Sequence, residues 1–290
     1  MKRELFLSIC FLLFTIFGTA QLGDEATILT LDQNGQLSIQ SNPNQSGDDY
    51  FQIHTVRVEN EKFLSIRNLN QEGFYFNLDG LEGSAEGNQF PLIALPQVDA
   101  ISVFATGAGT DRLDFYDEFD VFDLENIDIS VSGLEEVYFL GNINLLSADI
   151  DIDASGFVYV SNQLTTSTGS ISITGNIDGD SSGNFSGVYL VDAEVTSGSG
   201  NVTISGVSGT MEADNHGVWI SEQSTVESTG FAGTVSISGT VNLNNGIAGN
   251  YGVLIEESSS VASSSNNLGL GELIITGEAS NGDLQDAIHI

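Results

Sequence analysis

The stretch Ile171-Ser-Ile-Thr-Gly175 decides the fold, because close copies of it recur along the second half of the chain. Each copy alternates apolar and mostly polar residues and then ends at a glycine. This pattern is typical of a short β-strand with one buried face. The other copies are Val202-Thr-Ile-Ser-Gly206, Val235-Ser-Ile-Ser-Gly239 and Leu273-Ile-Ile-Thr-Gly277.

Two further strands recur with the same spacing. One begins at a small residue, and a weaker one is centred on Val195, Val226 and Val261. The members of the first series are Gly187-Val-Tyr-Leu190, Gly217-Val-Trp-Ile220, Gly252-Val-Leu-Ile255 and Ala287-Ile-His-Ile290. Upstream, the same unit appears in compact form with a step of 21 residues. The step predicts two inward columns: Ile129, Ile150, Ile171, Val202, Val235, Leu273 and Val131, Ile152, Ile173, Ile204, Ile237, Ile275.

Strands that recur once per turn stack in parallel about 4.8 Å apart. The repeats therefore predict an all-β fold over residues 101–290, a parallel β-helix (solenoid) of three sheets. The handedness of parallel crossovers favours a right-handed coil. We expect the stack to continue beyond Ile290 in a longer polypeptide, because the chain stops within an inward-facing strand.

The N-terminal part of the chain lacks this register. Residues 1–20 are typical of a secretory signal peptide, since Lys2 and Arg3 precede an apolar run that is shorter than the roughly 18 residues of a membrane span. Residues 21–100 contain strand patterns and predict either a β cap over the end of the stack or a separate small β domain. The chain is thus expected to be exported, extracellular or at the cell surface, with no transmembrane segment.

Composition limits the partners. The chain carries 6 basic and 40 acidic side chains, a net charge of −34, and has no Lys or Arg beyond Arg112. Such a surface repels phosphate backbones, so nucleic acid is excluded as a partner. The only cysteine, Cys10, lies within the signal segment, so neither disulfides nor thiolate metal sites are expected after cleavage.

Polar insertions lengthen the later turns after the glycine-ended strand. They are rich in Gly, Asn, Asp and Ser and should all leave from one corner of the coil. They cover about 176–186, 207–216, 240–251 and 278–286. Repeat proteins with insertions on one edge often bind partners there.

These repeats resemble those of filamentous-haemagglutinin-type and autotransporter-like bacterial surface adhesins. The resemblance rests on GSISITG, GNVTISG and GTVSISG alternating with SGVYL, HGVWI and YGVLI, and covers about two thirds of the chain. It implies a β-helix stalk that attaches cells to surface glycans, to proteins or to one another, including self-association along the rod. We expect the secretion or anchoring segments of that family to lie outside the repeats seen here.

The outward position of the glycine-led strands forms an aromatic column. Tyr138, Tyr159, Tyr189 and Trp219 are its aromatic members, followed by Leu254 and His289. Aromatic side chains exposed once per turn could stack on sugar rings or on a protein. The alternative is that the long insertions fold back and bury the column.

Acidic side chains form a second candidate site. Asp128 lies one turn from Asp149, Asp151 follows in the next outward column, and Asp111 lies in an acidic stretch just upstream. Carboxylates about 4.8 Å apart repel one another, so Ca²⁺ would relieve the repulsion. The alternative is a solvated acidic face. No cofactor is required in either case.

Catalysis has little support in the sequence. A polysaccharide lyase typically needs a basic residue near its acidic sugar, and the repeats have none beyond Arg112. A carboxylate-based glycoside hydrolase needs only two acids and stays open as the alternative. The sequence therefore predicts a non-enzymatic structural and adhesive module.

Overall fold

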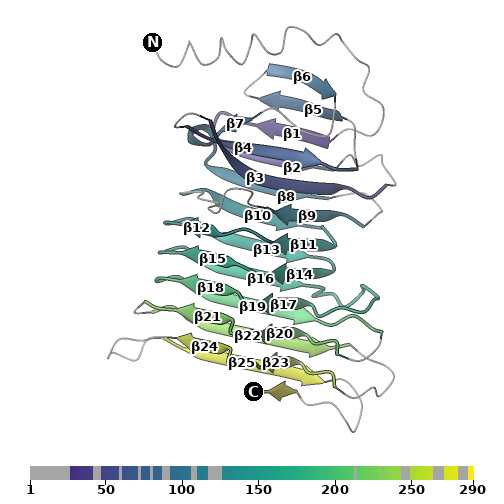
Figure 1. The fold of residues 1–290 in the computed structure, drawn as a ribbon, viewed down its shortest axis with the longest axis vertical. Coiled ribbons are helices and arrows are strands. Elements are labelled where there is room, and N and C mark those ends of the chain that lie inside the picture. The colour runs from purple at the N-terminus through teal and green to yellow at the C-terminus, as the bar shows by residue number, and fades with distance from the viewer. Residues whose placement is uncertain are drawn as a thin grey trace.

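The computed structural model describes residues 27–41, 47–58, 61–70, 73–78, 81–86, 92–105, 110–116, 126–211, 214–230, 232–242, 249–263, 271–279 and 287–290. The expected signal peptide lies outside these ranges. Apart from one 3-10 turn, Leu95–Gln97, every regular element in them is a β-strand. The strands lie one above another along an elongated molecule (Figure 1).

The described strands belong to three sheets of eleven, ten and five strands. In spatial order, sheet A contains β6 (Leu81–Glu86), β5 (Gly73–Leu78), β1 (Thr27–Leu31), β2 (Gln36–Gln40), β8 (Ala100–Phe104), β10 (Asp128–Ser132), β13 (Ile150–Ala154), β16 (Ile171–Gly175), β19 (Val202–Val207), β22 (Val235–Val241) and β25 (Leu273–Ala279).

Sheet B contains β7 (Ile93–Ala94), β4 (Glu61–Asn68), β3 (Tyr50–Val58), β9 (Arg112–Phe115), β11 (Glu136–Phe139), β14 (Phe157–Val160), β17 (Val188–Val191), β20 (Val218–Ser221), β23 (Val253–Ile255) and β26 (Ile288–His289). Sheet C contains β12 (Ile143–Leu145), β15 (Gln163–Thr166), β18 (Glu194–Ser197), β21 (Thr225–Ser228) and β24 (Ser260–Ser263).

The predicted inward columns are confirmed. From β8 to β25 every neighbouring pair of strands in sheet A is parallel, and Ile150 pairs with Ile171, which pairs with Val202. The members of both columns from Ile129 to Ile237 are at most 1% exposed. Leu273, in the last turn that the structure describes, is 44% exposed because no described turn lies beyond it.

The register extends further towards the N-terminus than the repeats predict. Leu37 in β2 pairs with Ile101 in β8, which pairs with Ile129 in β10. Sheet B is likewise continuous, since Phe51 in β3 pairs with Leu113 in β9. The N-terminal strands therefore share both long sheets with the repeats, and one buried cluster of apolar side chains runs through both regions.

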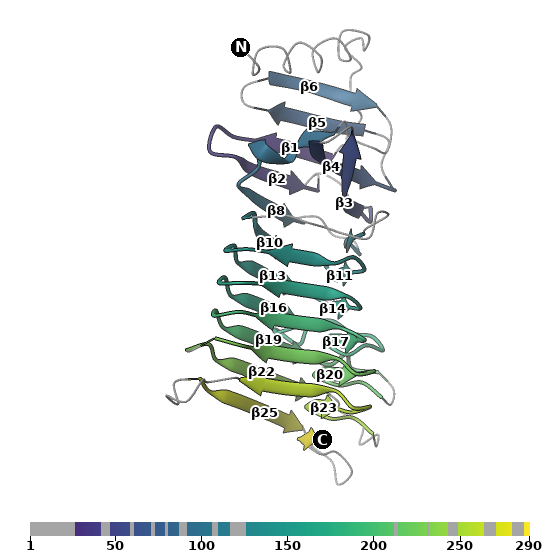
Figure 2. The same cartoon turned by 60° about the vertical axis from the view of Figure 1, so that its left-hand side comes forward.

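What distinguishes the N-terminal strands is their direction. The pairs β1–β2, β3–β4, β4–β7 and β5–β6 are antiparallel, whereas every pair from β8 onwards is parallel. Figure 2 shows these hairpins at one end of the stack.

Each repeated strand of sheet A has its glycine where two chain segments touch. Only β16 ends there, whereas β19, β22 and β25 continue one or two residues beyond the glycine. A Cβ added to Gly206 would lie 2.1 Å from the carbonyl oxygen of Gly217, a distance that side chains do not tolerate. Gly175 and Gly239 meet Gly187 and Gly252 in the same way. This corner, between sheet A and sheet B, is where the insertions leave, and the described parts of the insertions confirm the predicted common corner.

Candidate functional site

The predicted aromatic column is present on the outer side of sheet B. Tyr138 pairs with Tyr159, Tyr159 with Tyr189, and Tyr189 with Trp219; Leu254 and His289 follow. The four aromatic side chains are half-buried, Leu254 is buried and His289 is exposed. The column is therefore neither fully covered by the insertions nor fully open.

Contacts between the rings decide what they can offer a ligand. Tyr189 and Trp219 stack with centroids 4.2 Å apart and planes 15° apart, so each covers one face of the other. Tyr159 meets Tyr189 edge to face at 5.7 Å. Tyr189 therefore covers one face of Trp219, and Leu254 follows Trp219 in the next turn of the column.

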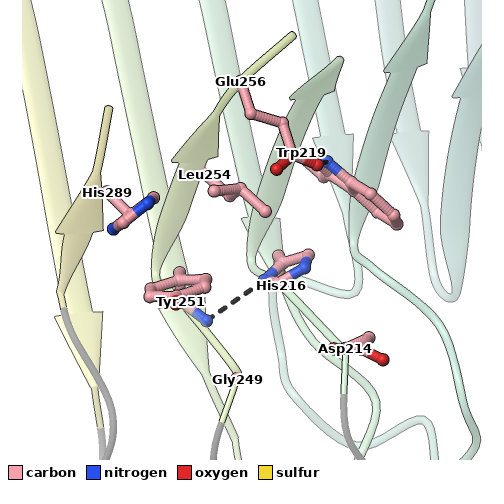
Figure 3. A pocket seen from close by; sticks show the side chains of 8 residues that line it. All are labelled: Asp214, His216, Trp219, Gly249, Tyr251, Leu254, Glu256 and His289. Carbon is pink, nitrogen blue, oxygen red and sulfur yellow. Dashed lines mark hydrogen bonds between the residues drawn. The ribbon is translucent and has the colours of Figure 1, made fainter. Parts of the chain in front are cut away.

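Two adjoining hollows lie beside this column, between sheet B and the insertions. One of about 320 Å³ is drawn in Figure 3 and lined by Asp214, His216, Trp219, Gly249, Tyr251, Leu254, Glu256 and His289. The other, about 430 Å³, is lined by Asn184, Phe185, Ser186, Tyr189, Asp214, Asn215 and Trp219. The hollows share Asp214 and Trp219, so they follow the stack over several turns.

His216 fixes the insertions around these hollows. Its backbone N–H donates to Ser186 Oγ at 3.1 Å, and its Nδ1 accepts the backbone N–H of Tyr251 at 3.1 Å (Figure 3). Its ring stacks on Tyr251 and meets Trp219 edge to face, with centroids 5.5 Å and 5.0 Å apart. Burial lowers the pKa of His216 to about 4, so the ring is neutral at pH 7.

The ionisable side chains of the hollows include two carboxyl groups, Asp214 and Glu256. Glu256 accepts the indole N–H of Trp219 at 2.9 Å, and Asp214 is exposed with a left-handed backbone φ of 63°. Among the residues that the structure describes, neither Lys nor Arg lines either hollow. The local field therefore disfavours anionic ligands such as uronates, sulfates and phosphates.

The acidic column on sheet A has a structural role that the sequence did not reveal. Asp128 Oδ1 accepts the backbone N–H of Asp149, and Asp149 Oδ1 accepts that of Ser170, at 2.8 and 2.7 Å. Ser170 Oγ accepts the N–H of Asn201, and Asn201 Oδ1 that of Thr234. We call this series the corner ladder, because each side chain caps the start of the next turn.

The four candidate calcium ligands do not form one group. Asp128 and Asp149 are neighbours in the corner ladder, Asp151 is exposed opposite Ser130, and Asp111 lies before β9 in sheet B. Within the described ranges, no three His, Cys, Asp or Glu side chains are placed to hold a metal ion.

Asp111 differs from the other three because it is only 2% exposed. Its Oδ1 accepts the backbone N–H of Asp49 at 2.9 Å. Burial raises its pKa to about 6, and the nearby negative charges of Asp49, Glu135 and Asp48 act in the same direction. Asp111 is thus a buried, repelled carboxylate at the junction between the N-terminal strands and the repeats.

Arg112, the last basic residue of the chain, is held in a cluster that sequence reasoning missed. Its guanidinium lies 3.8 Å from the ring centroid of Tyr138 and 4.7 Å from that of Tyr50. Its Nε and Nη2 donate to the two oxygens of Asp114 at 2.7 and 3.1 Å. The partners come from three strands of sheet B, so their assembly has no local signature in the sequence.

No protein-family model, curated protein or solved structure matches the chain. Across the described ranges there is also no helix with the length and apolar character needed to span a membrane.

Proposed function

We propose that this chain is an exported structural and adhesive β-solenoid, wound as a right-handed β-helix of three sheets, without catalytic turnover. The observation that carries the proposal is the shared register of the turns, which makes a rigid support for the insertions at one corner. The N-terminal hairpins serve as a cap over one end of the stack. The proposed setting is a bacterial surface or secreted adhesin.

The proposed contact surface is the pair of hollows beside the aromatic column. The half-buried rings of Tyr189 and Trp219 and the polar insertions suit an uncharged or cationic face of a glycan or protein. The acidity of the chain disfavours nucleic acids and anionic polymers. Self-association along the rod is part of the same proposal, and the binding assay measures it separately from ligand binding.

A binding assay with a matched variant tests this proposal. Labelled protein is applied to arrays of neutral, amino and acidic glycans and to whole cells, and its oligomeric state is measured in parallel. Trp219→Leu introduces the residue that the next turn already carries at Leu254, so the fold is preserved. We expect Trp219→Leu to reduce binding, while Tyr138→Leu, remote from the hollows, leaves it unchanged. Equal binding by both variants would remove the hollows from the proposal.

A carboxylate-based glycoside hydrolase is the second candidate, because Asp214 and Glu256 line one hollow. Two acids are sufficient for glycoside hydrolysis when a sugar fits between them. Incubation with a panel of polysaccharides, followed by an assay for reducing ends, separates the two functions. Sustained product release that Glu256→Gln abolishes would replace the adhesive proposal by the enzymatic one.

Calcium binding by Asp111, Asp128, Asp149 and Asp151 stays a prediction. Added Ca²⁺ at millimolar concentration should raise the melting temperature if it relieves repulsion between carboxylates. Mg²⁺ at equal ionic strength is the control, since screening alone would act equally with both ions. An unchanged melting temperature in Ca²⁺ would remove calcium from the account.

A further inference from the structure

Two carboxyl groups that line the hollow in Figure 3, those of Asp214 and Glu256, are largely unused within the protein. Glu256 Oε1 accepts the indole N–H of Trp219 at 2.9 Å, which fixes this carboxyl group beside the ring. Within the described part of the chain, Glu256 Oε2 and both side-chain oxygens of Asp214 accept no hydrogen bond. The hollow therefore presents acidic acceptors that a ligand can engage.

Among the residues that the structure describes, no Lys or Arg lies near these carboxyl groups. The basic side chains of the described strands all belong to β3, β4 and β9 of sheet B: Arg57, Lys62, Arg67 and Arg112. The nearest of these strands to β20, which carries Trp219, is β9, and four strand spacings separate the two, about 19 Å. His216 adds no charge at neutral pH, because burial lowers its pKa to about 4. A positive charge beside the two carboxyl groups therefore has to come from outside the described part of the chain.

Aromatic and imidazole rings form the wall between the two carboxyl groups. Figure 3 shows Glu256 and Asp214 at different ends of the hollow, with side chains of Trp219 and His216 between them. His216 stacks on Tyr251 with ring centroids 5.5 Å apart. Such a wall keeps water from one side of each carboxyl group, and an ion pair is stronger where water is partly excluded. The ring edges also offer apolar contact to the C–H groups of a sugar.

The two hollows together are elongated along the stack. They share Asp214 and Trp219, and the rings that line them run from Tyr189 on β17 to His289 on β26. Three strand spacings separate β17 from β26, about 14 Å, so a short linear oligomer fits this length better than a single small molecule does. Amide and hydroxyl side chains line the second hollow: Asn184, Ser186 and Asn215. These groups are suitable hydrogen-bond partners for the hydroxyls of a sugar.

We infer that the hollows bind an amino glycan, a linear oligosaccharide that carries protonated primary amines. The inference rests on the proposed adhesive function and names its ligand class. One ammonium group contacts Glu256 Oε2 and another contacts the carboxyl group of Asp214, while sugar rings pack along Trp219. The net charge of −34 raises the concentration of cations around the whole chain. The hollows add what exposed carboxylates elsewhere lack, such as Asp153 on the outer face of sheet A: a concave site lined by rings.

The test compares ligands of similar length that differ in charge or in sugar content. The protein is titrated in a calorimeter at pH 5.5 with the glucosamine trimer, the N-acetylglucosamine trimer and trilysine. At this pH the sugar amines are protonated, and trilysine carries the same net charge as the glucosamine trimer. We expect the glucosamine trimer to bind about tenfold more tightly than either of the others. N-acetylation removes the charge, and trilysine lacks the sugar rings.

Two variants locate the contacts of the ammonium groups. Asp214→Asn and Glu256→Gln each remove one negative charge from the hollow, and the amide oxygen of Glu256→Gln can still accept the indole N–H of Trp219. Each should weaken binding of the glucosamine trimer about fivefold. Asp153→Asn removes the same charge from the outer face of sheet A and should leave binding unchanged. Equal weakening by Asp153→Asn would assign the effect to net charge and overturn the inference.

The failure of this inference can be distinguished from the failure of the proposed function. Tight binding of the N-acetylglucosamine trimer that Trp219→Leu weakens would overturn the amine contact and leave the adhesive function in place. Equally tight binding of trilysine would also overturn the inference, because charge alone would then be sufficient. Absence of binding by both sugars would overturn it together with the choice of these hollows as the contact surface for glycans.

Discussion

The compact turns and the lengthened turns share one core although they contain different amounts of chain. The step between equivalent positions is 21 residues from Asp128 to Asp149 but 31 from Ser170 to Asn201 and 33 from Asn201 to Thr234. Strand pairing in sheet A stays in register across this change. Most of the additional residues leave at the corner between sheets A and B. Others lie between sheet C and sheet A, where the link grows from four residues after β18 to six after β21 and nine after β24, and the columns are not disturbed.

The cost of such insertions is small compared with what the columns provide. The entropy of closing a loop rises only with the logarithm of its length, so doubling a loop costs about 0.6 kcal/mol. Burying one inward Val, Ile or Leu contributes roughly 1.5–3 kcal/mol. The corner can therefore carry variable chemistry while the sheets stay fixed.

The largest expected effect is the loss of stability when one buried side chain is shortened in a compact turn or in a lengthened turn. Ile152→Ala in a compact turn and Ile204→Ala in a lengthened turn each remove a fully buried side chain. Each should lower the free energy of unfolding by about 3 kcal/mol, measured by urea denaturation.

Similar losses in the two variants would show that the insertions leave the core unchanged. A much smaller loss for Ile204→Ala would break the comparison, because it would show that the lengthened turns pack more loosely. Ser172→Ala, on the outer face between the two sites, is the control and should change stability by less than about 0.5 kcal/mol.

Most of the stack could be predicted because its residues repeat. Ile150, Ile171 and Val202 occupy equivalent inward positions, and burial restricts each of them to a few apolar residue types. The antiparallel N-terminal hairpins and their shared register through Leu37 could not be predicted, since no 21-residue step links β2, β8 and β10. Cross-strand pairing over such distances has no local signal.

Burial of Asp111, at the junction between the N-terminal strands and the repeats, should favour the folded state in acid. The folded-state pKa of Asp111 is about 6, above its usual value of 3.8, so its favourable contribution is present below pH 3.8 and is lost as the pH rises through 6. Asp111→Asn keeps an oxygen that can accept the N–H of Asp49 and removes the charge.

At pH 7.5, Asp111→Asn should raise the melting temperature by about 2–4 °C, the shift that roughly 1 kcal/mol produces in a chain of this size. The gain should disappear near pH 4, where the wild-type carboxyl is protonated in the fold. Asp151→Asn, an exposed carboxylate, is the control. An Asp111→Asn variant that is less stable at pH 7.5 would show that the carboxylate is bound to a cation or base.

The lengthened turns should respond to acid in the opposite direction. The folded-state pKa of His216 is about 4, below its usual 6.5, so its contribution is present above pH 6.5 and is lost as the pH falls through 4. Protonated Nδ1 cannot accept the N–H of Tyr251. Hydrogen exchange of the Tyr251 amide should therefore accelerate relative to the amide of Ile152 as the pH falls from 6.5 to 4, after correction for intrinsic exchange rates.

His216→Asn is the matched variant, because its side-chain oxygen can replace Nδ1 as acceptor without titrating in this range. It should lose stability at neutral pH through reduced packing on Trp219 and Tyr251, but its dependence on acid should be weaker. An identical pH profile in the variant would assign the acid response to another group.

The hollows were predicted only in part from the sequence. The column from Tyr138 to Trp219 and the corner of the insertions follow from the repeat. The contact between His216 and Tyr251 was missed although the repeat carries its signal: each residue directly precedes the glycine that leads a strand of sheet B, so the two lie one turn apart. The capping role of Asp149 was missed for a different reason: its carboxylate satisfies a backbone donor, whereas charge alone had indicated a metal.

The smallest expected effect concerns the corner ladder, which changes from carboxylate in the compact turns to hydroxyl and amide in the lengthened ones. Asp149→Ala removes the acceptor for the N–H of Ser170, and Asn201→Ala removes the acceptor for that of Thr234. Each should cost about 1 kcal/mol, since one hydrogen bond at an exposed position is lost. Asp149→Asn should restore most of the stability if the oxygen, and not the charge, is what the turn requires. If Asp149→Asn is as unstable as Asp149→Ala, then the charge matters, and the ladder of the compact turns is electrostatic where that of the lengthened turns is not.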